Sequence, residues 1–141
     1  MSFVLALHIL AVGIWLGCLA TEIFFEKLME RDESARLFVS LLHDRVDRFV
    51  EGPAFVVTGV TGLVLTQDAV WTPALIAKVV LGASAILLNV WCVKVVVDRA
   101  AAAGEGRWQD WVRVDHLQHK VGGLVTVLLI AAVAMAITRI M

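Results

Sequence analysis

Apolar residues fill four long stretches of this chain, and most of the charged residues lie between them. The stretches cover residues 3–25, 49–66, 73–97 and 121–137. A helix needs about 20 mostly apolar residues to cross the hydrocarbon layer of a bilayer, and each stretch is roughly that long. The pattern therefore predicts an all-α integral membrane protein whose surface contacts the lipid bilayer.

Flanking residues extend these stretches into longer helices. We expect four helices, over about 3–26, 35–66, 73–98 and 108–139. Ser34 can cap the second helix, and Pro73 suits the first turn of the third, where a missing N–H is harmless. Residues 100–106 are expected to form the turn before the fourth helix. Because the links are short, residues 1–141 should form a single transmembrane domain, a four-helix up-down bundle.

The composition agrees with a membrane location and excludes several functions. Hydrophobic residues make up 60% of the chain and the mean hydropathy is +0.87, whereas a soluble domain is nearer half apolar and more charged. The 12 basic and 13 acidic residues nearly cancel, so no nucleic acid partner is expected. The sequence also has no phosphate-binding loop, serine elbow or zinc-finger spacing.

Basic residues gather at two of the three connections. Between the first two helices lie Lys27, Arg31, Arg36, Arg45 and Arg48. Around the last connection lie Lys94, Arg99, Arg107, Arg113 and Lys120. The link over 67–72 has neither Lys nor Arg. Since positive residues are retained on the cytoplasmic side, we expect a bacterial-type inner (plasma) membrane protein with both basic loops cytoplasmic and both termini outside, Arg139 being the one terminal exception.

Two ionisable residues lie inside apolar stretches near the outer face. At 1.5 Å per residue, His8 and Lys78 each lie about 9 Å into their helices, the first and the third. These helices run in the same direction, so the two residues share a depth. An ionisable residue at membrane depth is a functional candidate by default. The alternative is that His8 hydrogen-bonds a neighbouring helix while Lys78 extends to the outer interface.

Short motifs in three helices resemble those of the HemJ-type membrane protoporphyrinogen oxidases and the related CopD copper-resistance domains. In the first helix the resemblance rests on Leu7, His8, Trp15, Gly17 and Leu19. In the second it rests on Pro53, Ala54, Thr58, Gly62 and Leu63. In the third it rests on Lys78, Val79, Val80 and Leu81, followed by Leu87, Leu88 and Asn89. The Pro-Arg and Tyr-His elements of the HemJ-type first helix are replaced here by residues 21–26.

The resemblance implies a cofactor and a reaction class. In the HemJ-type family a first-helix His and a third-helix Lys are associated with haem b, and His8 and Lys78 are the corresponding positions here. Imidazole is a usual axial ligand of haem iron. The resemblance therefore implies a haem-binding membrane oxidoreductase that performs porphyrin or electron-transfer chemistry, with a redox partner or a second copy of the chain as partner.

A second group of candidate ligands gathers toward the inner end of the predicted bundle. It consists of Glu22, Glu26, His43, Asp47, Glu51, Asp115, His116 and His119. Spacings of three and four place side chains on one helical face, so each helix could direct two or three ligands to a common point. Imidazole and carboxylate together suit a divalent transition metal: Fe, Zn, Cu or Mn, with the carboxylates favouring Mn, Fe or Zn over Cu(I).

Other interpretations of this group remain open. The same residues could form a salt-bridge network or a set of independently solvated charges. Glu51 lies within an apolar span and needs a partner, for which the candidates are a protonated Asp98, or Arg48, Arg113 or Lys120. We therefore carry three functional hypotheses: a haem- or metal-binding redox protein, a protein for copper-type metal handling or transport, and a non-catalytic membrane scaffold subunit.

Overall fold

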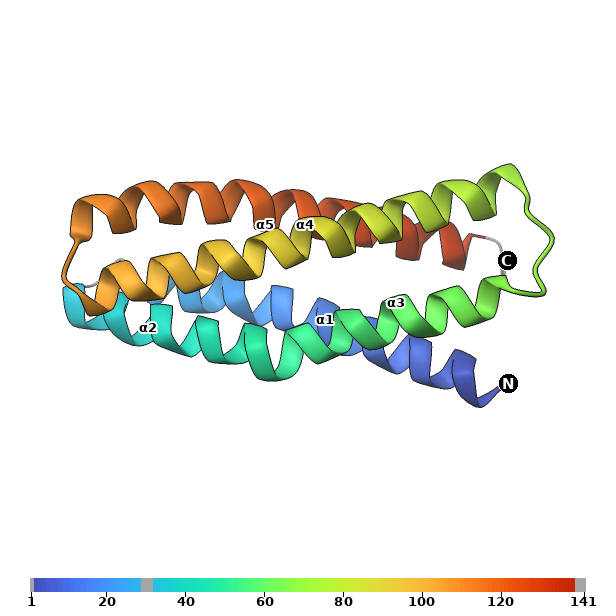
Figure 1. Ribbon diagram of the computed structural model, residues 1–141, viewed down its shortest axis with the longest axis horizontal. Helices are drawn as coiled ribbons and strands as arrows, with labels where there is room; N and C mark the ends of the chain where they lie inside the picture. Colours follow the sequence, from blue (N-terminus) through green and yellow to red (C-terminus); the bar gives the residue numbers. More distant parts are fainter. Residues whose placement is uncertain (1, 29–31, 139–141) are drawn as a thin grey trace.

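The computed structural model describes residues 2–28 and 32–138, which form a bundle of long helices (Figure 1). The elements are α1 (Phe3–Leu28), α2 (Glu33–Val46), the π-helical segment η1 (Asp47–Glu51), α3 (Gly52–Thr66), α4 (Pro73–Gly104) and α5 (Trp108–Ile137). The described residues contain no strand, so the predicted all-α four-helix bundle is confirmed. Arg31 and Arg139, used above for the charge pattern and a helix end, lie outside the described residues.

Four helical segments of the described chain are long and apolar enough to cross a membrane. They are Phe3–Lys27, Glu33–Thr66, Pro73–Gly104 and Trp108–Ile137. Their outer faces expose large apolar side chains, including Phe3, Leu63, Leu87 and Val127. Lipid is the favourable environment for such a surface, since a soluble monomer rarely exposes so much contiguous apolar area.

Both ends of the described chain and the link between α3 and α4 lie at one end of the bundle (Figure 1). The turn between α4 and α5 and the beginning of α2 lie at the opposite end. α4 packs mainly along α5, and α1 packs mainly along α3. The up-down order expected from the short links is therefore observed.

Local sequence signals explain where the helices begin. Thr72 caps α4, its side chain accepting a hydrogen bond from the Leu75 N–H at 3.3 Å, and Pro73 occupies the first turn. The prediction that Ser34 caps the second helix is wrong, because Asp32 is the cap of α2 and accepts from the Ala35 N–H at 2.8 Å. An ionised carboxylate is the stronger acceptor at this position.

The turn before α5 is shorter than residues 100–106. α4 continues to Gly104, six residues past the predicted end at 98, and the chain reverses near Gly106, whose φ of 68° favours glycine. Alanine has the highest helix propensity, so the run of alanines extends the helix. Ala102 and Ala103 also pack in an apolar cluster with Val39 and Trp111.

The continuous helical segment Glu33–Thr66 contains a widened turn, η1, where α2 passes into α3. In η1 the Gly52 N–H bonds to the Asp47 carbonyl, five residues back. A Cβ at Gly52 would lie only 2.8 Å from that carbonyl oxygen, so glycine permits the wide turn. Pro53 follows and has no N–H to bond a preceding carbonyl. Such π turns are frequent at functional sites, and this one carries Asp47 and Glu51.

Two apolar clusters fill the interior, and a polar region separates them. One cluster contains Trp15, Leu19, Ala54, Phe55, Ala85, Val125 and Leu129. The other is the cluster of Val39, Ala102, Ala103 and Trp111 near the α4–α5 turn. The candidate acidic and imidazole side chains lie between these clusters, on α1, on α2 and η1, and on α5.

Candidate metal site between the apolar clusters

Three ligand-type side chains from α1, α2 and η1 meet in the first part of this region. We call Glu22, His43 and Asp47 the inner triad; one ligand atom from each lies within 4.8 Å of the others. His43 Nε2 is 3.1 Å from Glu22 Oε2 and 3.5 Å from Asp47 Oδ1. His43 and Asp47 are only 3% and 4% exposed. Independently solvated charges are therefore excluded for these two residues.

Glu51 lies one helical turn beyond Asp47 and is 2% exposed. Its Oε1 accepts hydrogen bonds from Trp15 Nε1 at 3.2 Å and from Asn89 Nδ2 at 2.6 Å. The predicted charged partners are wrong. Asp98 pairs instead with Lys94 on α4, and Arg48 pairs with Asp44, one helical turn before it in the chain. Neutral donors hold this carboxyl group because they are the polar groups buried at its depth.

Three carboxyl oxygens at this point are buried without a hydrogen-bond partner: Glu22 Oε1, Asp47 Oδ1 and Glu51 Oε2. The carboxyl groups of Asp47 and Glu51 lie close to that of Glu22. A buried polar group without a partner is costly, and neighbouring buried carboxylates repel one another. A cation, or protons held between the carboxyl groups, would offset this cost.

A second group of three lies nearer the solvent. We call Glu26, Asp115 and His119 the mouth triad; its ligand atoms also fall within 4.8 Å of one another. His119 Nε2 is 3.5 Å from Glu26 Oε2, and His119 Nδ1 is 3.5 Å from Asp115 Oδ2. The His119 side chain is 51% exposed. The mouth triad thus connects the buried inner triad to the surface.

His116, the remaining candidate, is exposed and belongs to neither triad. It follows Asp115 directly, and consecutive helical residues point about 100° apart. The eight predicted ligands therefore divide into the inner triad, the adjacent Glu51, the mouth triad and an isolated surface histidine.

Arg99 lies between the two triads and is fully buried. Its Nη1 donates to Asp115 Oδ1 at 2.8 Å and to Glu26 Oε1 at 3.1 Å. Its Nη2 lies 2.9 Å from His43 Nδ1. A salt-bridge network, one of the interpretations left open above, is therefore present at the mouth triad. His43 extends its contacts to the inner carboxylates Glu22 and Asp47.

Sequence reasoning missed two of the buried polar residues here. Arg99 was assigned only to a basic flank, and Gln118, whose Nε2 lies 3.2 Å from His43 Nδ1, had no role. A signal existed for both. Each lies on the same helical face as apolar residues that pack inward, Val95 and Val96 for Arg99 and Val121 for Gln118.

His8 and Lys78 lie in a separate polar region near the other end. His8 is half-buried, and its Nδ1 is 2.9 Å from the hydroxyl of Thr61 on α3. That hydroxyl donates its proton to the Val57 carbonyl at 2.6 Å, so it must accept from His8 Nδ1–H. The Nε2 lone pair is then free. Lys78, also half-buried, is close enough to His8 for their charges to interact.

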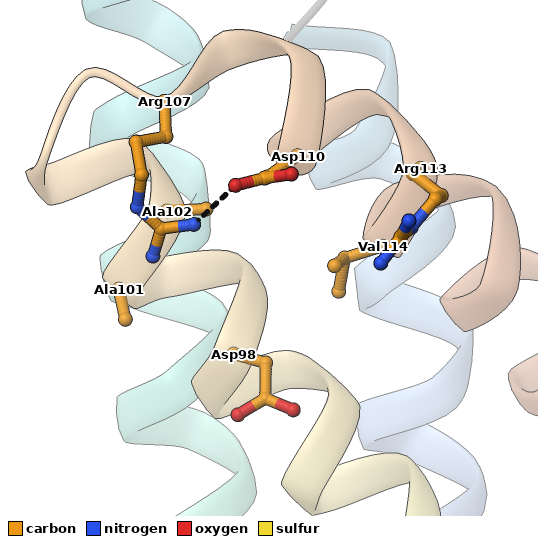
Figure 2. A pocket seen from close by; sticks show the side chains of 7 residues that line it. All are labelled: Asp98, Ala101, Ala102, Arg107, Asp110, Arg113 and Val114. Atoms are coloured by element: carbon orange, nitrogen blue, oxygen red, sulfur yellow. Dashed lines mark hydrogen bonds and ion pairs between the residues drawn. The ribbon is translucent and has the colours of Figure 1, made fainter.

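A surface pocket of about 260 Å³ opens beside the α4–α5 turn (Figure 2). Its lining consists of Asp98, Ala101, Ala102, Arg107, Asp110, Arg113 and Val114. Arg107 bonds Glu105 at 2.7 Å and Asp110 at 2.6 Å, and these bonds raise its pKa further above the ordinary value. The pocket shares no residue with either triad, and its bonded charges stabilise the turn.

Comparisons of the chain with protein-family models, with curated protein sequences and with solved structures return no match. The function of the site must therefore be inferred from its own residues. Those residues are the buried His43, Asp47 and Glu51 with the largely buried Glu22 beside them, and the partly exposed mouth triad that leads to them.

Proposed function

We propose that this chain is an integral membrane protein that binds a divalent transition metal ion at Glu22, His43, Asp47 and Glu51. The observation that carries the proposal is the set of three buried carboxyl oxygens without partners around the His43 imidazole. A divalent cation would bind these oxygens and offset the repulsion between the carboxylates. It would also use the one nitrogen ligand that the site offers.

The ligand types restrict the metal. Three carboxylates and one imidazole suit Mn²⁺, Fe²⁺ or Zn²⁺, whereas Cu(I) prefers sulfur ligands. A metal site also needs an entry path, and the partly exposed mouth triad supplies one. These features favour metal handling, that is uptake, export or sensing of the ion, over the copper-specific alternative.

Quantification of metal in the untagged, detergent-purified protein tests this proposal. After expression with added Mn²⁺, Fe²⁺ or Zn²⁺, we expect close to one equivalent of one of these metals, because a four-ligand site should hold its ion through purification. Less than about a tenth of an equivalent of each metal would refute the site.

The charge pattern supports an orientation for the proposed protein. We propose an inner-membrane location with both basic connections cytoplasmic and both termini outside, because Lys and Arg concentrate on the cytoplasmic side of short loops. The mouth triad would then open toward the cytoplasm. A C-terminal fusion to a reporter that is active only outside the cytoplasm tests this orientation, and an inactive reporter would contradict it.

Haem b on His8 and Lys78, with membrane redox chemistry, is the second candidate function. It is supported by the tautomer of His8, whose Nδ1–H is held by Thr61 while Nε2 is free to act as a ligand. We expect a Soret band in protein from haem-replete cells, and its loss in His8→Ala but not in His116→Ala. A wild-type spectrum without that band would eliminate this candidate and leave the metal site untouched.

A further inference from the structure

Arg99 is the one fully buried cation in the described part of the chain that contacts both triads. It reaches them from α4, which supplies no member of either triad. Its guanidinium contacts Glu26 and Asp115 on one side and His43 on the other, while its Nε is buried without a hydrogen-bond partner. The residue thus places a permanent positive charge beside the point where a metal ion would bind.

The contact between Arg99 and His43 determines which ring nitrogen of the neutral imidazole carries the proton. Arginine remains protonated in proteins and can only donate hydrogen bonds. His43 Nδ1, 2.9 Å from Arg99 Nη2, must therefore present its lone pair to the guanidinium. In a neutral imidazole the proton is then on Nε2, where it is donated to Glu22 Oε2 at 3.1 Å.

A metal ion needs the opposite tautomer. Nε2 is the nitrogen that faces Glu22 and Asp47, so it is the atom that would ligate the ion. Nδ1 must then carry the proton, as second-shell donors of metal-bound histidines do. An Nδ1–H cannot face the Arg99 N–H at this distance, because neither group offers a lone pair.

The surroundings already contain acceptors for that Nδ1–H. Glu26 Oε1 lies 3.3 Å from Nδ1. Gln118 places its amide nitrogen 3.2 Å from Nδ1, while its Oε1 is buried without a partner. Rotation of the amide by half a turn would bring Oε1 to Nδ1. Arg99 can retain Glu26 and Asp115 when it leaves His43.

We propose that Arg99 hydrogen-bonds His43 in the metal-free protein and thereby keeps the imidazole in the tautomer that cannot bind a metal ion. When a divalent ion binds, the Arg99 guanidinium moves away from His43 and keeps its bonds to Glu26 and Asp115. The inference rests on the proposed metal site and adds its regulation. Gln118 exchanges donor for acceptor in the same step. Arg99 thus lowers the affinity of the site for the metal ion, because its positive charge repels the nearby divalent cation.

Binding of Zn²⁺ to Arg99→Gln and to the wild type in detergent tests this inference. We expect the variant to bind Zn²⁺ about tenfold more tightly or better, since it lacks the competing charge. Its metal-free unfolding midpoint should be lower than that of the wild type and should rise more on addition of Zn²⁺. Arg107→Gln is the matched control, because Arg107 also bonds two carboxylates but lies away from both triads; its Zn²⁺ affinity should equal the wild-type value.

Equal or weaker Zn²⁺ binding by Arg99→Gln, with measurable binding by the wild type, would overturn the displacement and leave the metal site standing. Failure of both proteins to bind Zn²⁺, Mn²⁺ or Fe²⁺ would overturn the site and the displacement together. If Arg99→Gln does not fold, ¹⁵N resonances of His43 in the wild type decide. Zn²⁺ should move the proton from Nε2 to Nδ1, and an Nδ1 that stays unprotonated would contradict the proposal.

Discussion

A protein in which alanine replaces His43 is expected to bind Zn²⁺ or Mn²⁺ at least about 100-fold more weakly than the wild type. His43 supplies the one nitrogen ligand of the proposed site, and loss of an outer-shell partner alone costs roughly 10- to 100-fold in metal affinity. Its imidazole also connects the two triads, with Nε2 on Glu22 and Nδ1 beside Glu26. Equilibrium dialysis or titration calorimetry of the detergent-solubilised variant measures the change.

His116→Ala is the matched control, because it removes the same side chain from an exposed position outside both triads. We expect its affinity to equal that of the wild type. Since His43 is almost fully buried, helix content and elution volume must show that the variant folds. Glu22→Gln, whose side chain is 13% exposed, provides a milder change to the same site. Wild-type affinity in both His43→Ala and Glu22→Gln would contradict the assignment of these ligands.

The bundle could be predicted from the sequence because a bilayer imposes one simple requirement on each crossing. Four apolar stretches of spanning length predict four helices, and short links predict their antiparallel order. The end of α4 was missed because the segment over 100–106 contains two glycines and was interpreted as a turn. The helix continues to Gly104 because Ala102 and Ala103 are buried against Val39 and Trp111. That contact depends on how α2 packs against α4.

Part of the site followed from helical periodicity. His43, Asp47 and Glu51 recur at spacing four, which predicts a common face, and all three are buried. The division into two triads could not be predicted, because it depends on the rotation of each helix about its axis. The burial of Arg99 could not be predicted for a related reason. A lone arginine near a helix end resembles an interfacial anchor until the packing shows that it points inward.

The partners of Glu51 show a further limit of pattern reasoning. The candidate partners from the sequence are three basic residues and a protonated aspartic acid, yet Trp15 and Asn89 are its donors. In the sequence, neither residue carries a pattern that marks it as a partner of a buried carboxyl group. Their side chains reach the carboxyl group because α1 and α4 both pass it at this depth, which is a property of the assembled bundle.

Replacement of Gly52 by alanine is expected to destabilise the protein by about 1–3 kcal/mol, the usual cost of overpacking a close contact. The added Cβ would lie 2.8 Å from the Asp47 carbonyl oxygen, which accepts the hydrogen bond that closes the π turn. The backbone must shift to relieve this contact. Since η1 carries Asp47 and Glu51, we also expect metal affinity to fall by about tenfold or more, as it does when groups that orient ligands are changed.

Gly13→Ala separates this effect from a general response to alanine in a helix. A Cβ at Gly13, in α1, meets no atom within 4 Å, and Gly to Ala in a helix interior is ordinarily favourable by about 0.5–1 kcal/mol. That variant should therefore unfold at or above the wild-type midpoint and bind metal normally. If Gly52→Ala unfolds at the wild-type midpoint and binds metal with unchanged affinity, the segment from α2 to α3 can adopt a regular helical turn without disturbing the ligands. The wide turn would then have no part in forming the site.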